Sequence, residues 1–404
     1  MSEDNARSRV VLAHPGPLIP AQGGGDVRTL NLLEYLHANG FEVHLITGKH
    51  GAAETKQLEQ RAYKVWSVNP HVGPQEAYPA LRDLVRKIRR YRNRKRPPGP
   101  GSDLHRRRNH RFEDWCFEIA YEVEPAAVIT PFAWHARILD RIPPDALGIL
   151  DTIDVQHVRT ERAREAGGDL DTRKWSRVHE QRELERADVL VAMQREEAAL
   201  LEQMCPESHV LVVGHACPVS AAPLQPSEEK TVVFAANLYD PNRRGIENFL
   251  RDVWPALRAR VPGANLIVCG RICEALSNPP PGVQFKGYVP DLESIYMRAA
   301  VLINPVPYST GLSVKVSEAL ARGRCVVATN AGVRGLDEHL DLPVDVADSP
   351  DEMVAALARL LQDPEERTRR EGEVWAWARQ HLAPEAVYKP IAEAIRDRKR
   401  LIRP

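Results

Sequence analysis

The chain has 404 residues, with 55 basic and 55 acidic side chains and a formal net charge of zero. This length is sufficient for two domains with separate hydrophobic cores. The balanced charge excludes the global positive field that favours nucleic-acid binding, and no recognition motif for nucleic acid is present. The composition is that of an ordinary globular protein rather than a disordered or fibrous one.

The N-terminus and the cysteines bear on location and on metal binding. The first residues, MSEDNARSR, are polar, and no apolar segment of a secretory signal follows them. No apolar run approaches the roughly 18 residues that span a bilayer. The six cysteines, at positions 116, 205, 217, 269, 273 and 325, lack the second Cys or His pair of a zinc site. We therefore expect buried, reduced thiols in a cytoplasmic protein that binds no metal.

Strands and helices alternate in the first half of the chain. Residues 9–14 form an apolar run that predicts a strand, and residues 27–39 carry apolar side chains at helical spacing. Gly40 ends that helix, and residues 41–46 predict the next strand. Strand, helix and strand in this order indicate a βαβ unit and therefore a parallel sheet. Further strands are predicted at 127–130, 148–151, 189–193 and 210–213.

The same alternation begins again after a segment rich in Pro, Ala and Ser. We interpret this segment, residues 217–230, as a linker between a first domain, 1–216, and a second domain, 231–383. Strands of the second domain are predicted at 231–235, 265–269, 283–285, 301–303 and 325–329. The predicted fold class is α/β, with two Rossmann-like, doubly wound domains. Ligands of such sheets bind at the carboxyl ends of the strands, so we expect the site in a cleft between two facing sheets.

The most informative stretch is Tyr308–Leu336, which reads YSTGLSVKVSEALARGRCVVATNAGVRGL. A turn of small residues leads into a predicted helix over 312–321, and a helix N-terminus favours an anion through its N–H groups and its dipole. Lys315 adds a charge that would meet a diphosphate. Glu318 lies about one turn further along, where its carboxylate can accept hydrogen bonds from two sugar hydroxyls. The predicted ligand is a nucleoside diphosphate that carries a sugar.

This stretch resembles the donor-binding segment of the retaining glycosyltransferases of family 4, or group 1, which have the GT-B fold. Members often carry two glutamates eight positions apart. Glu318 matches the second of them, whereas Thr310 stands where the first would be. Gly311, Lys315 and Glu318 instead match the G-x-x-x-K-x-x-E pattern of a subgroup.

The resemblance implies positions for other residues of the second half. It places Gly311, Leu312 and Ser313 in the donor site and Glu318 on the donor ribose. It also implies that residues 384–404 contain a helix that crosses back to the first domain.

Two stretches near strand ends fit the same family. Gly24 and Gly25 lie in a glycine run that we predict as a loop, where GT-B enzymes bring their backbone close to the donor diphosphate and a Cβ would block the approach. We expect Arg28 to face the same cleft. Arg244, before Gly245, matches the family's basic residue on the diphosphate, and its planar fork suits a phosphate. The alternatives are a surface turn for the glycines and a solvated side chain for Arg244.

Two weaker candidates follow strands of the second domain. Tyr288 lies in the stretch that matches the family's base-binding segment, and it is a candidate for stacking on the nucleobase. A core or surface tyrosine is the alternative for Tyr288. Arg271 follows the predicted strand 265–269 and is a candidate for contact with a phosphate or a sugar.

Candidates for the acceptor side lie after strands of the first half. His135, Asp154 and His157 are polar residues of the kind that orient an acceptor hydroxyl near the reacting sugar carbon. A structural role is the alternative for each of them. Residues 169–171 read Asp-Leu-Asp, formally a metal-binding D-x-D motif, but this motif lies in a polar loop and we expect no metal there.

Residues 82–111 form the one strongly charged segment. Thirteen basic side chains lie between Arg82 and Arg111, and only Asp83 and Asp103 oppose them. This segment favours docking to an anionic membrane surface or to a phosphorylated, lipid-linked acceptor, at the inner face of the membrane. The alternative is a solvated helix followed by a Pro-Gly loop.

The leading hypothesis is a retaining glycosyltransferase that moves a sugar from a nucleoside-diphosphate sugar to an acceptor hydroxyl. Lys315, Arg244 and the N–H groups near Gly311 would stabilise the departing diphosphate in place of a metal ion. The nucleotide sugar is a co-substrate, and we expect no cofactor. Polysaccharide, lipid-linked glycan and natural-product acceptors remain open.

Two alternatives stay within the same fold. One is an epimerase that acts on a nucleotide sugar, and the other is a non-catalytic sugar-nucleotide-binding protein. A nicotinamide-dependent dehydrogenase is disfavoured, because the glycine run lacks the G-x-G-x-x-G spacing and the second strand ends without a ribose-binding acid.

Overall fold

The computed structural model describes residues 8–21, 23–69, 110–165, 175–222, 230–290, 292–309, 311–336 and 339–403. The chain divides into two compact units. Unit 1 groups Met1–His157, Trp175–Val213 and Tyr388–Pro404, and unit 2 groups Val158–Lys174 and Gly214–Val387. The predicted domain bounds at 216, 230 and 383 stay predictions. None of the helices in the described ranges combines the length and the apolar character needed to cross a membrane.

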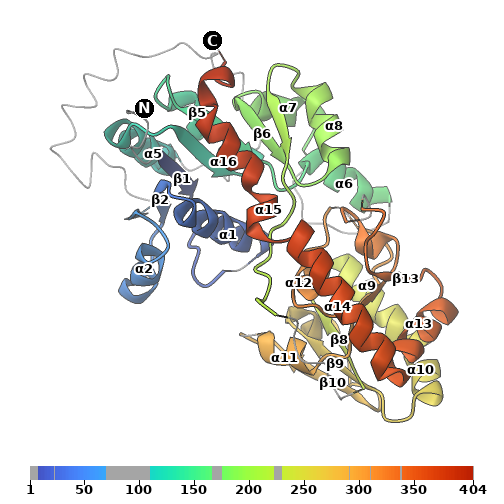
Figure 1. Ribbon diagram of the computed structural model, residues 1–404. Helices are drawn as coiled ribbons and strands as arrows, with labels where there is room; N and C mark the ends of the chain where they lie inside the picture. Colours follow the sequence, from blue (N-terminus) through green and yellow to red (C-terminus); the bar gives the residue numbers. More distant parts are fainter. Residues whose placement is uncertain are drawn as a thin grey trace. The chain divides into compact units, whose positions relative to one another are not determined.

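Unit 1 is built on a parallel sheet of seven strands in the order β3-β2-β1-β4-β5-β6-β7. Figure 1 labels β1, β2, β5 and β6 of this sheet. Its strands are β1 (Arg9–His14), β2 (Glu42–Gly48), β3 (Lys64–Val68), β4 (Ala127–Pro131), β5 (Leu147–Asp151), β6 (Val189–Ala192) and β7 (His209–Val212). The central strands are buried on both faces, which explains why they read as continuous apolar runs rather than as alternating patterns. The strand order reverses between β1 and β4, where doubly wound folds bind ligands.

Helices connect these strands. They are α1 (Gly24–Ala38), α2 (Ala52–Glu59), α5 (His110–Val123), η4 (Ala133–Arg141), α6 (Gln156–Glu165), α7 (Arg177–Leu184), α8 (Arg195–Met204), α16 (Lys389–Arg396) and η8 (Arg398–Arg400). α16 begins after Tyr388, whose hydroxyl donates a hydrogen bond to the carbonyl of Arg28 at 3.1 Å. Residues 388–403 are thereby joined to α1.

Unit 2 is built on a parallel sheet of six strands in the order β10-β9-β8-β11-β12-β13. Its strands are β8 (Thr231–Ala235), β9 (Asn265–Cys269), β10 (Val283–Gly287), β11 (Val301–Asn304), β12 (Val326–Ala328) and β13 (Asp345–Val346). Its helices are α9 (Asp240–Asn248), η5 (Phe249–Val253), α10 (Trp254–Arg260), η6 (Arg271–Ala275), α11 (Glu293–Arg298), α12 (Val314–Ala321), η7 (Ala331–Val333), α13 (Pro350–Gln362), α14 (Pro364–His381) and α15 (Pro384–Val387).

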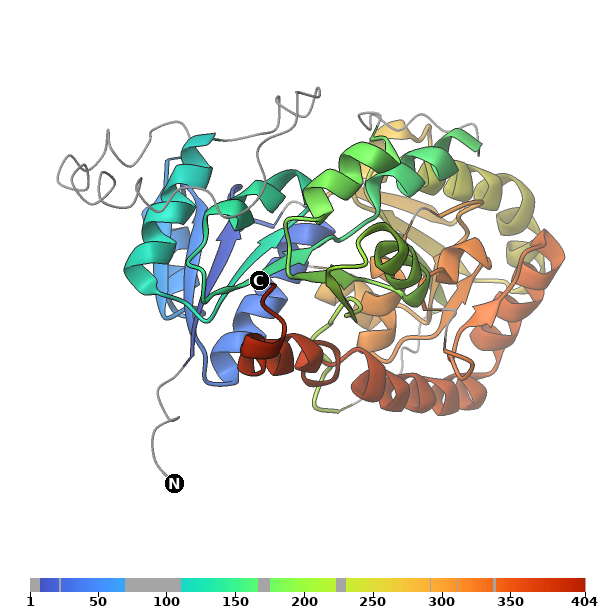
Figure 2. The same ribbon diagram turned by 90° about the horizontal axis from the view of Figure 1, so that it is seen from above.

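Helices cover both faces of this sheet (Figure 2). Each face carries its own half of the core. Val232 and Phe234 of β8 pack with α9, α10 and α13, whereas Val233 between them packs with α11, α12 and α14. Adjacent strand residues point to opposite faces, so one apolar strand serves both layers. The strand order reverses between β8 and β11, which places the candidate site at their carboxyl ends.

The predictions agree with these elements in type and differ at the margins. The predicted strands 9–14, 231–235 and 265–269 coincide with β1, β8 and β9. The sequence missed β3 and the two-residue β13, which are edge strands with few buried side chains. The prediction of a loop at Gly24 and Gly25 is wrong, because both residues lie in the first turn of α1.

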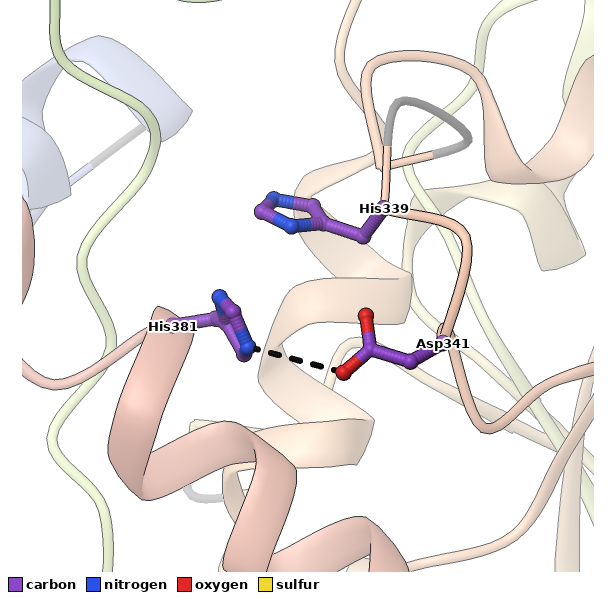
Figure 3. Close-up of side chains that lie close together, drawn as sticks. All are labelled: His339, Asp341 and His381. Carbon is purple, nitrogen blue, oxygen red and sulfur yellow. Dashed lines mark ion pairs between the residues drawn. The ribbon is translucent and has the colours of Figure 1, made fainter.

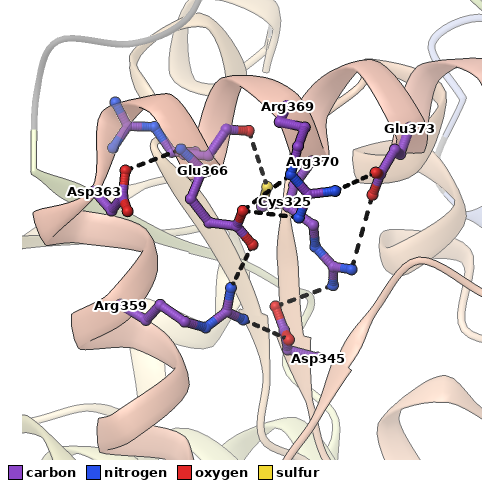
Figure 4. Close-up of polar contacts among 9 residues, drawn as sticks. Cys325, Asp345, Arg359, Asp363, Glu366, Arg369, Arg370 and Glu373 are labelled. Carbon is purple, nitrogen blue, oxygen red and sulfur yellow. Dashed lines mark hydrogen bonds and ion pairs between the residues drawn. The ribbon is translucent and has the colours of Figure 1, made fainter.

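Ion pairs fasten α13 and α14 to the edge of the second sheet (Figure 4). Arg359 of α13 pairs with Asp345 of β13 at 2.7 Å and with Glu366 of α14 at 2.9 Å. Arg370 reaches the same Asp345 at 3.3 Å. Exposed pairs of this kind contribute little stability individually.

Candidate active site

Lys315 is the centre of a polar cluster in unit 2. It lies in the first turn of α12, and its Nζ donates hydrogen bonds to Asn304 Oδ1 at 3.1 Å and to Asn242 Oδ1 of α9. Burial lowers the pKa of Lys315 to about 8. Within the described ranges, no carboxylate pairs with this ammonium group. A desolvated cation held only by neutral oxygens favours an incoming anion.

Asn304 holds Lys315 in place. Its side chain is buried at the end of β11, and its Nδ2 donates to Ser313 Oγ at 2.9 Å and to the carbonyl of Gly332 at 2.7 Å. One amide therefore joins the strand end, the start of α12 and the turn η7. A Cβ on Gly332 would lie 2.3 Å from the carbonyl oxygen of Asn304, so this position requires glycine.

Arg244 lies nearby on α9, the helix that also supplies Asn242. Its Nε pairs with Asp240 Oδ2 at 2.9 Å, and the hydroxyl of Tyr308 donates to the same oxygen at 2.7 Å. A Cβ on Gly245 would lie 2.7 Å from the carbonyl oxygen of Pro305. The glycine therefore lets α9 approach the residues that follow β11.

Glu318 lies about one turn beyond Lys315 on α12. Its Oε2 accepts a long hydrogen bond of 3.4 Å from the hydroxyl of Tyr296, and burial raises the pKa of this carboxyl group. The Arg322 guanidinium lies 4.5 Å from the centre of the Tyr296 ring and pairs with Glu293 at 2.9 Å. Because a carboxylate accepts about four hydrogen bonds, Glu318 has capacity for ligand hydroxyls.

The structure brings several predicted donor-site residues together. Gly311, Leu312 and Ser313 lead directly into α12, and the backbone N–H of Ser313 donates to the carbonyl of Arg334 at 3.2 Å. α9 brings Arg244 to the same strand ends as Lys315. The asparagines at 242 and 304 were missed, because a single Asn in a strand or helix carries no signal in the sequence.

Arg271 and Tyr288 lie outside this cluster. The side chain of Arg271 is 62% exposed and pairs with Glu274 at 3.2 Å. Tyr288 is 68% exposed. Among the described residues, neither is joined to Lys315 by a hydrogen bond or an ion pair.

In unit 1, the first turn of α1 meets the residues that follow β4 and β5. A Cβ on Gly25 would lie 2.7 Å from Phe132 Cζ and 3.4 Å from Ile153 Cδ1. Phe132 and Ile153 have φ angles of 64° and 63°, a region that residues other than glycine rarely adopt. Such strain collects at functional sites, and the sequence contained no signal for it.

The predicted acceptor-side candidates follow these two strained residues. The backbone N–H of His135 donates to the carbonyl of Phe132 at 3.0 Å, and its ring lies 6.0 Å edge-on from Trp134. The Phe132 and Trp134 rings are stacked, with centres 4.4 Å apart. Asp154 follows Ile153, and its carbonyl accepts a hydrogen bond of 3.2 Å from the Gln156 side chain.

Two predictions in unit 1 are corrected. Arg28 is 1% exposed and does not face a cleft, because its Nε pairs with Asp151 at 2.6 Å and its Nη2 donates to the carbonyl of Val213 at 2.9 Å. His157 is buried, and its Nδ1 lies 2.7 Å from Glu180 Oε2. Glu180 also accepts the backbone N–H of His157 at 2.9 Å, which caps the start of α6. Both residues hold elements together.

One pair near these loops was missed. His14 ends β1, and its Nε2 lies 3.2 Å from Asp26 Oδ1 in the first turn of α1. The signal for it was a histidine at the last position of an apolar strand. Several sequence candidates lie outside the described residues, namely Thr310, the Asp-Leu-Asp motif at 169–171 and the basic segment up to residue 109.

Comparison with known families identifies the segment that contains Lys315 and Arg244. Residues 229–363 match the family model described as Glycosyl transferases group 1. This match includes Tyr308–Leu336, so the resemblance of that stretch to group 1 glycosyltransferases is confirmed at the level of the family model. A search of curated protein sequences finds no match to the chain.

Solved structures of glycosyltransferases share the fold of the whole chain. Sucrose-phosphate synthase from Thermosynechococcus elongatus is similar over 98% of this chain and 100% of its own, with a TM-score of 0.66 and 17% identity. S. aureus TarM, solved with UDP and α-GlcNAc-glycerol, gives a TM-score of 0.67 at 10% identity over 96% of this chain and 99% of its own. HepE from Anabaena, solved with UDP, gives 0.61 at 13% identity over 96% and 100%. The predicted GT-B class is confirmed at the level of the fold.

Proposed function

We propose that this protein is a retaining glycosyltransferase that moves a sugar from a nucleoside-diphosphate sugar to an acceptor hydroxyl. The observation that carries the proposal is the ammonium group of Lys315 at the start of α12, which is desolvated and, among the described residues, hydrogen-bonded to two amide oxygens and paired with no carboxylate. The match to group 1 glycosyltransferases covers this residue. A diphosphate is the anion that such a site in such a domain would bind.

Charge stabilisation by side chains accounts for the chemical step. When the bond between the sugar and the diphosphate breaks, negative charge develops on the leaving phosphate oxygens. Lys315 Nζ and the Arg244 guanidinium would donate hydrogen bonds to these oxygens, in place of a metal ion. A preorganised donor of this kind lowers the free-energy barrier by about 3–4 kcal/mol. Asn304 contributes by fixing the position of Nζ.

Glu318 would hold the ribose of the donor. Within the part of the chain that the structure describes, its carboxylate accepts one long hydrogen bond, so it can accept two ribose hydroxyls without breaking a strong interaction. Burial raises the pKa of the free carboxyl group, and hydrogen bonds from ligand hydroxyls would favour its ionised form. Glu318→Gln should therefore raise the KM for the donor by about tenfold, with a smaller effect on kcat.

UDP is the first nucleotide to test, because TarM and HepE were solved with it. The acceptor is a hydroxyl of a polysaccharide, a lipid-linked glycan or a natural product. His135 and Asp154 are the candidates for orienting it, since both follow strained residues at the strand ends of unit 1. The chemistry as proposed needs no cofactor.

Thermal unfolding in the presence of UDP, GDP, ADP and dTDP tests the donor site. A ligand at about a hundredfold above its Kd adds about 2.7 kcal/mol, enough to raise the midpoint by several degrees. We expect a selective rise with one diphosphate that Lys315→Ala reduces. A cooperative transition that no diphosphate shifts would refute the proposal.

The reaction itself is tested with the sugar nucleotide of the selected base. Release of the diphosphate, with a new glycosidic bond of the same anomeric configuration as the donor by NMR, is the expected result. A product with the opposite anomeric configuration would still indicate a transferase but would contradict the retaining mechanism. An altered sugar nucleotide without transfer would indicate an epimerase.

A further inference from the structure

Three metal-ligating side chains gather in unit 2, on residues that the donor site does not use (Figure 3). His339, Asp341 and His381 each offer one ligand atom, and these atoms lie within 4.8 Å of one another. His381 ends α14, whereas the other two lie in the turn that leads towards β13. His381 Nε2 and Asp341 Oδ2 are 3.8 Å apart.

The two imidazole rings are held by an aromatic neighbour. Trp377, one turn earlier on α14, stacks on His381 with ring centres 4.7 Å apart and meets the His339 ring edge-on at 5.3 Å. The two histidine rings are themselves 4.6 Å apart. Trp377 is buried, so it provides a fixed surface for both rings. The orientation of both rings is therefore set by packing, as a preformed metal site requires.

An ordinary ion pair does not account for the arrangement. His381 Nε2 is shielded from solvent and takes part in no hydrogen bond among the described residues. Its separation of 3.8 Å from the Asp341 oxygen exceeds hydrogen-bond length. A buried polar atom without a partner calls for an explanation, and an ion between the three side chains supplies one.

We propose that His339, Asp341 and His381 bind a transition-metal ion, with Zn²⁺ as the first candidate. Two imidazoles and one carboxylate suit Zn²⁺, whereas Mg²⁺ and Ca²⁺ prefer oxygen ligands alone. Zinc-to-ligand distances of about 2.0–2.2 Å require the three groups to move closer, which rotation of the exposed Asp341 side chain and small shifts of the two packed rings would provide. Water would complete a tetrahedral ion at the fourth position.

The ion would tie the turn of His339 and Asp341 to the end of α14. Hydrogen bonds from the N–H of His339 to the carbonyl of Leu336, and from the N–H of Leu342 to the carbonyl of His339, make this turn compact. A metal cross-link stabilises the folded state because the unfolded chain does not hold the three ligands together. The proposed site is structural and does not depend on the proposed transferase activity.

The test uses the full chain without an affinity tag. Zn²⁺ binding is measured by titration calorimetry, and Co²⁺ is used as a spectroscopic probe whose visible absorption reports tetrahedral coordination. We expect one equivalent of either metal to bind, with a rise in the thermal midpoint. His381→Ala and His339→Ala should each weaken binding by at least about tenfold, and Asp341→Asn should weaken it as well.

The control is His37→Ala, which removes an exposed histidine of α1 in unit 1 and should leave metal binding unchanged. Circular dichroism checks that each variant folds, and two separate histidine variants guard against the loss of one to misfolding. The proposal is overturned if the wild-type chain binds neither metal, or if folded His381→Ala and His339→Ala bind as tightly as the wild type.

Discussion

The carboxyl ends of the two sheets carry different chemistry on the same topology. In unit 2, the ends of β8 and β11 are surrounded by charged and amide side chains, with Lys315 and Asn304 in direct contact. In unit 1, Phe132 and Ile153, which follow β4 and β5, lie at positive φ against Gly25, and His14 at the end of β1 pairs with Asp26.

This difference suggests how each end would contribute. A diphosphate is recognised by cations and hydrogen-bond donors, and such groups must be placed one by one. A sugar acceptor is recognised by stacking on aromatic rings and by hydrogen bonds to its hydroxyls, and the stacked rings of Phe132 and Trp134, with His135 and Asp154 as polar candidates, would serve these two roles. On this assignment, substitutions in unit 2 should change the chemical step, whereas those in unit 1 should change acceptor binding and stability.

Lys315→Ala should produce the largest effect on catalysis. Removal of a preorganised donor to the leaving phosphate should lower kcat by roughly 10²–10³-fold. The matched control is Lys230→Ala, an exposed lysine before the amino end of β8, which should leave kcat unchanged. Steady-state kinetics with saturating donor measures both. An equal loss of kcat in the two variants, or a wild-type kcat in Lys315→Ala, would contradict the catalytic role proposed for Lys315 in unit 2.

His44 in unit 1 provides the next contrast, because its titration should affect the pH dependence of stability rather than activity. It is 7% exposed, and within the described chain neither ring nitrogen has a hydrogen-bond partner. Burial, with Lys64 and Arg9 nearby, lowers the pKa of His44 from 6.5 to about 4. The unfolded chain therefore binds an extra proton between these values, so stability falls as the pH falls from 6.5 towards 4.

The loss is about 3 kcal/mol at pH 4, since one pKa unit is worth about 1.4 kcal/mol. His44→Leu should flatten the acid side of a plot of thermal midpoint against pH. His37→Gln, at an exposed histidine of α1, should keep the slope of the wild type. An unchanged slope in His44→Leu would show that other groups control acid stability in this unit.

In unit 2, the lowered pKa of Lys315 should instead affect the pH dependence of activity. The pKa of Lys315 is lowered to about 8, so in the free protein the ammonium form is lost as the pH rises through that value. We expect kcat/KM for the donor to fall about tenfold per pH unit above 8. Lys315→Arg, which stays charged, should extend activity to higher pH. A wild-type profile that is flat to pH 10 would contradict the role of the lysine charge.

Residues that are close together in the sequence could be placed in the site from the sequence alone, whereas residues brought together only by the fold could not. The glycine turn, the lysine and the glutamate of α12 form a pattern within eight positions, from 311 to 318, so local spacing was sufficient to predict their common location. Asn304 and Asn242 reach Lys315 only through the strand order, and no short-range pattern contains that information.

In unit 1, the misleading signals were polar residues on the helices that follow two of the strands, α1 after β1 and α6 after β5. Arginine and histidine are residue types that often bind ligands. In the structure, however, Arg28 pairs with the buried Asp151, and His157 pairs with the buried Glu180. Burial decides between a ligand contact and a structural pair, and it depends on long-range packing. Backbone strain at Phe132 and Ile153 is likewise a property of the fold, because the residue types themselves give no hint of positive φ.

Gly25→Ala should give the smallest catalytic effect and tests unit 1 directly. The new Cβ would meet Phe132 Cζ at 2.7 Å and must displace a ring that is stacked on Trp134. Overpacking of this kind costs about 1–3 kcal/mol, part of which the loop can relieve by moving, so we expect kcat/KM for transfer to fall by about tenfold or less. In Gly23→Ala the Cβ meets nothing within 4 Å, and activity should be unchanged.

Binding of the diphosphate separates two explanations for that loss. If Gly25 shapes the acceptor side through Phe132, the affinity for the diphosphate stays at the wild-type value while the KM for the acceptor rises. If the backbone at Gly25 approaches the diphosphate itself, as the family resemblance implies, the affinity for the diphosphate falls instead. The second result would place part of the donor site in unit 1 and would break the division of roles between the two strand-end regions.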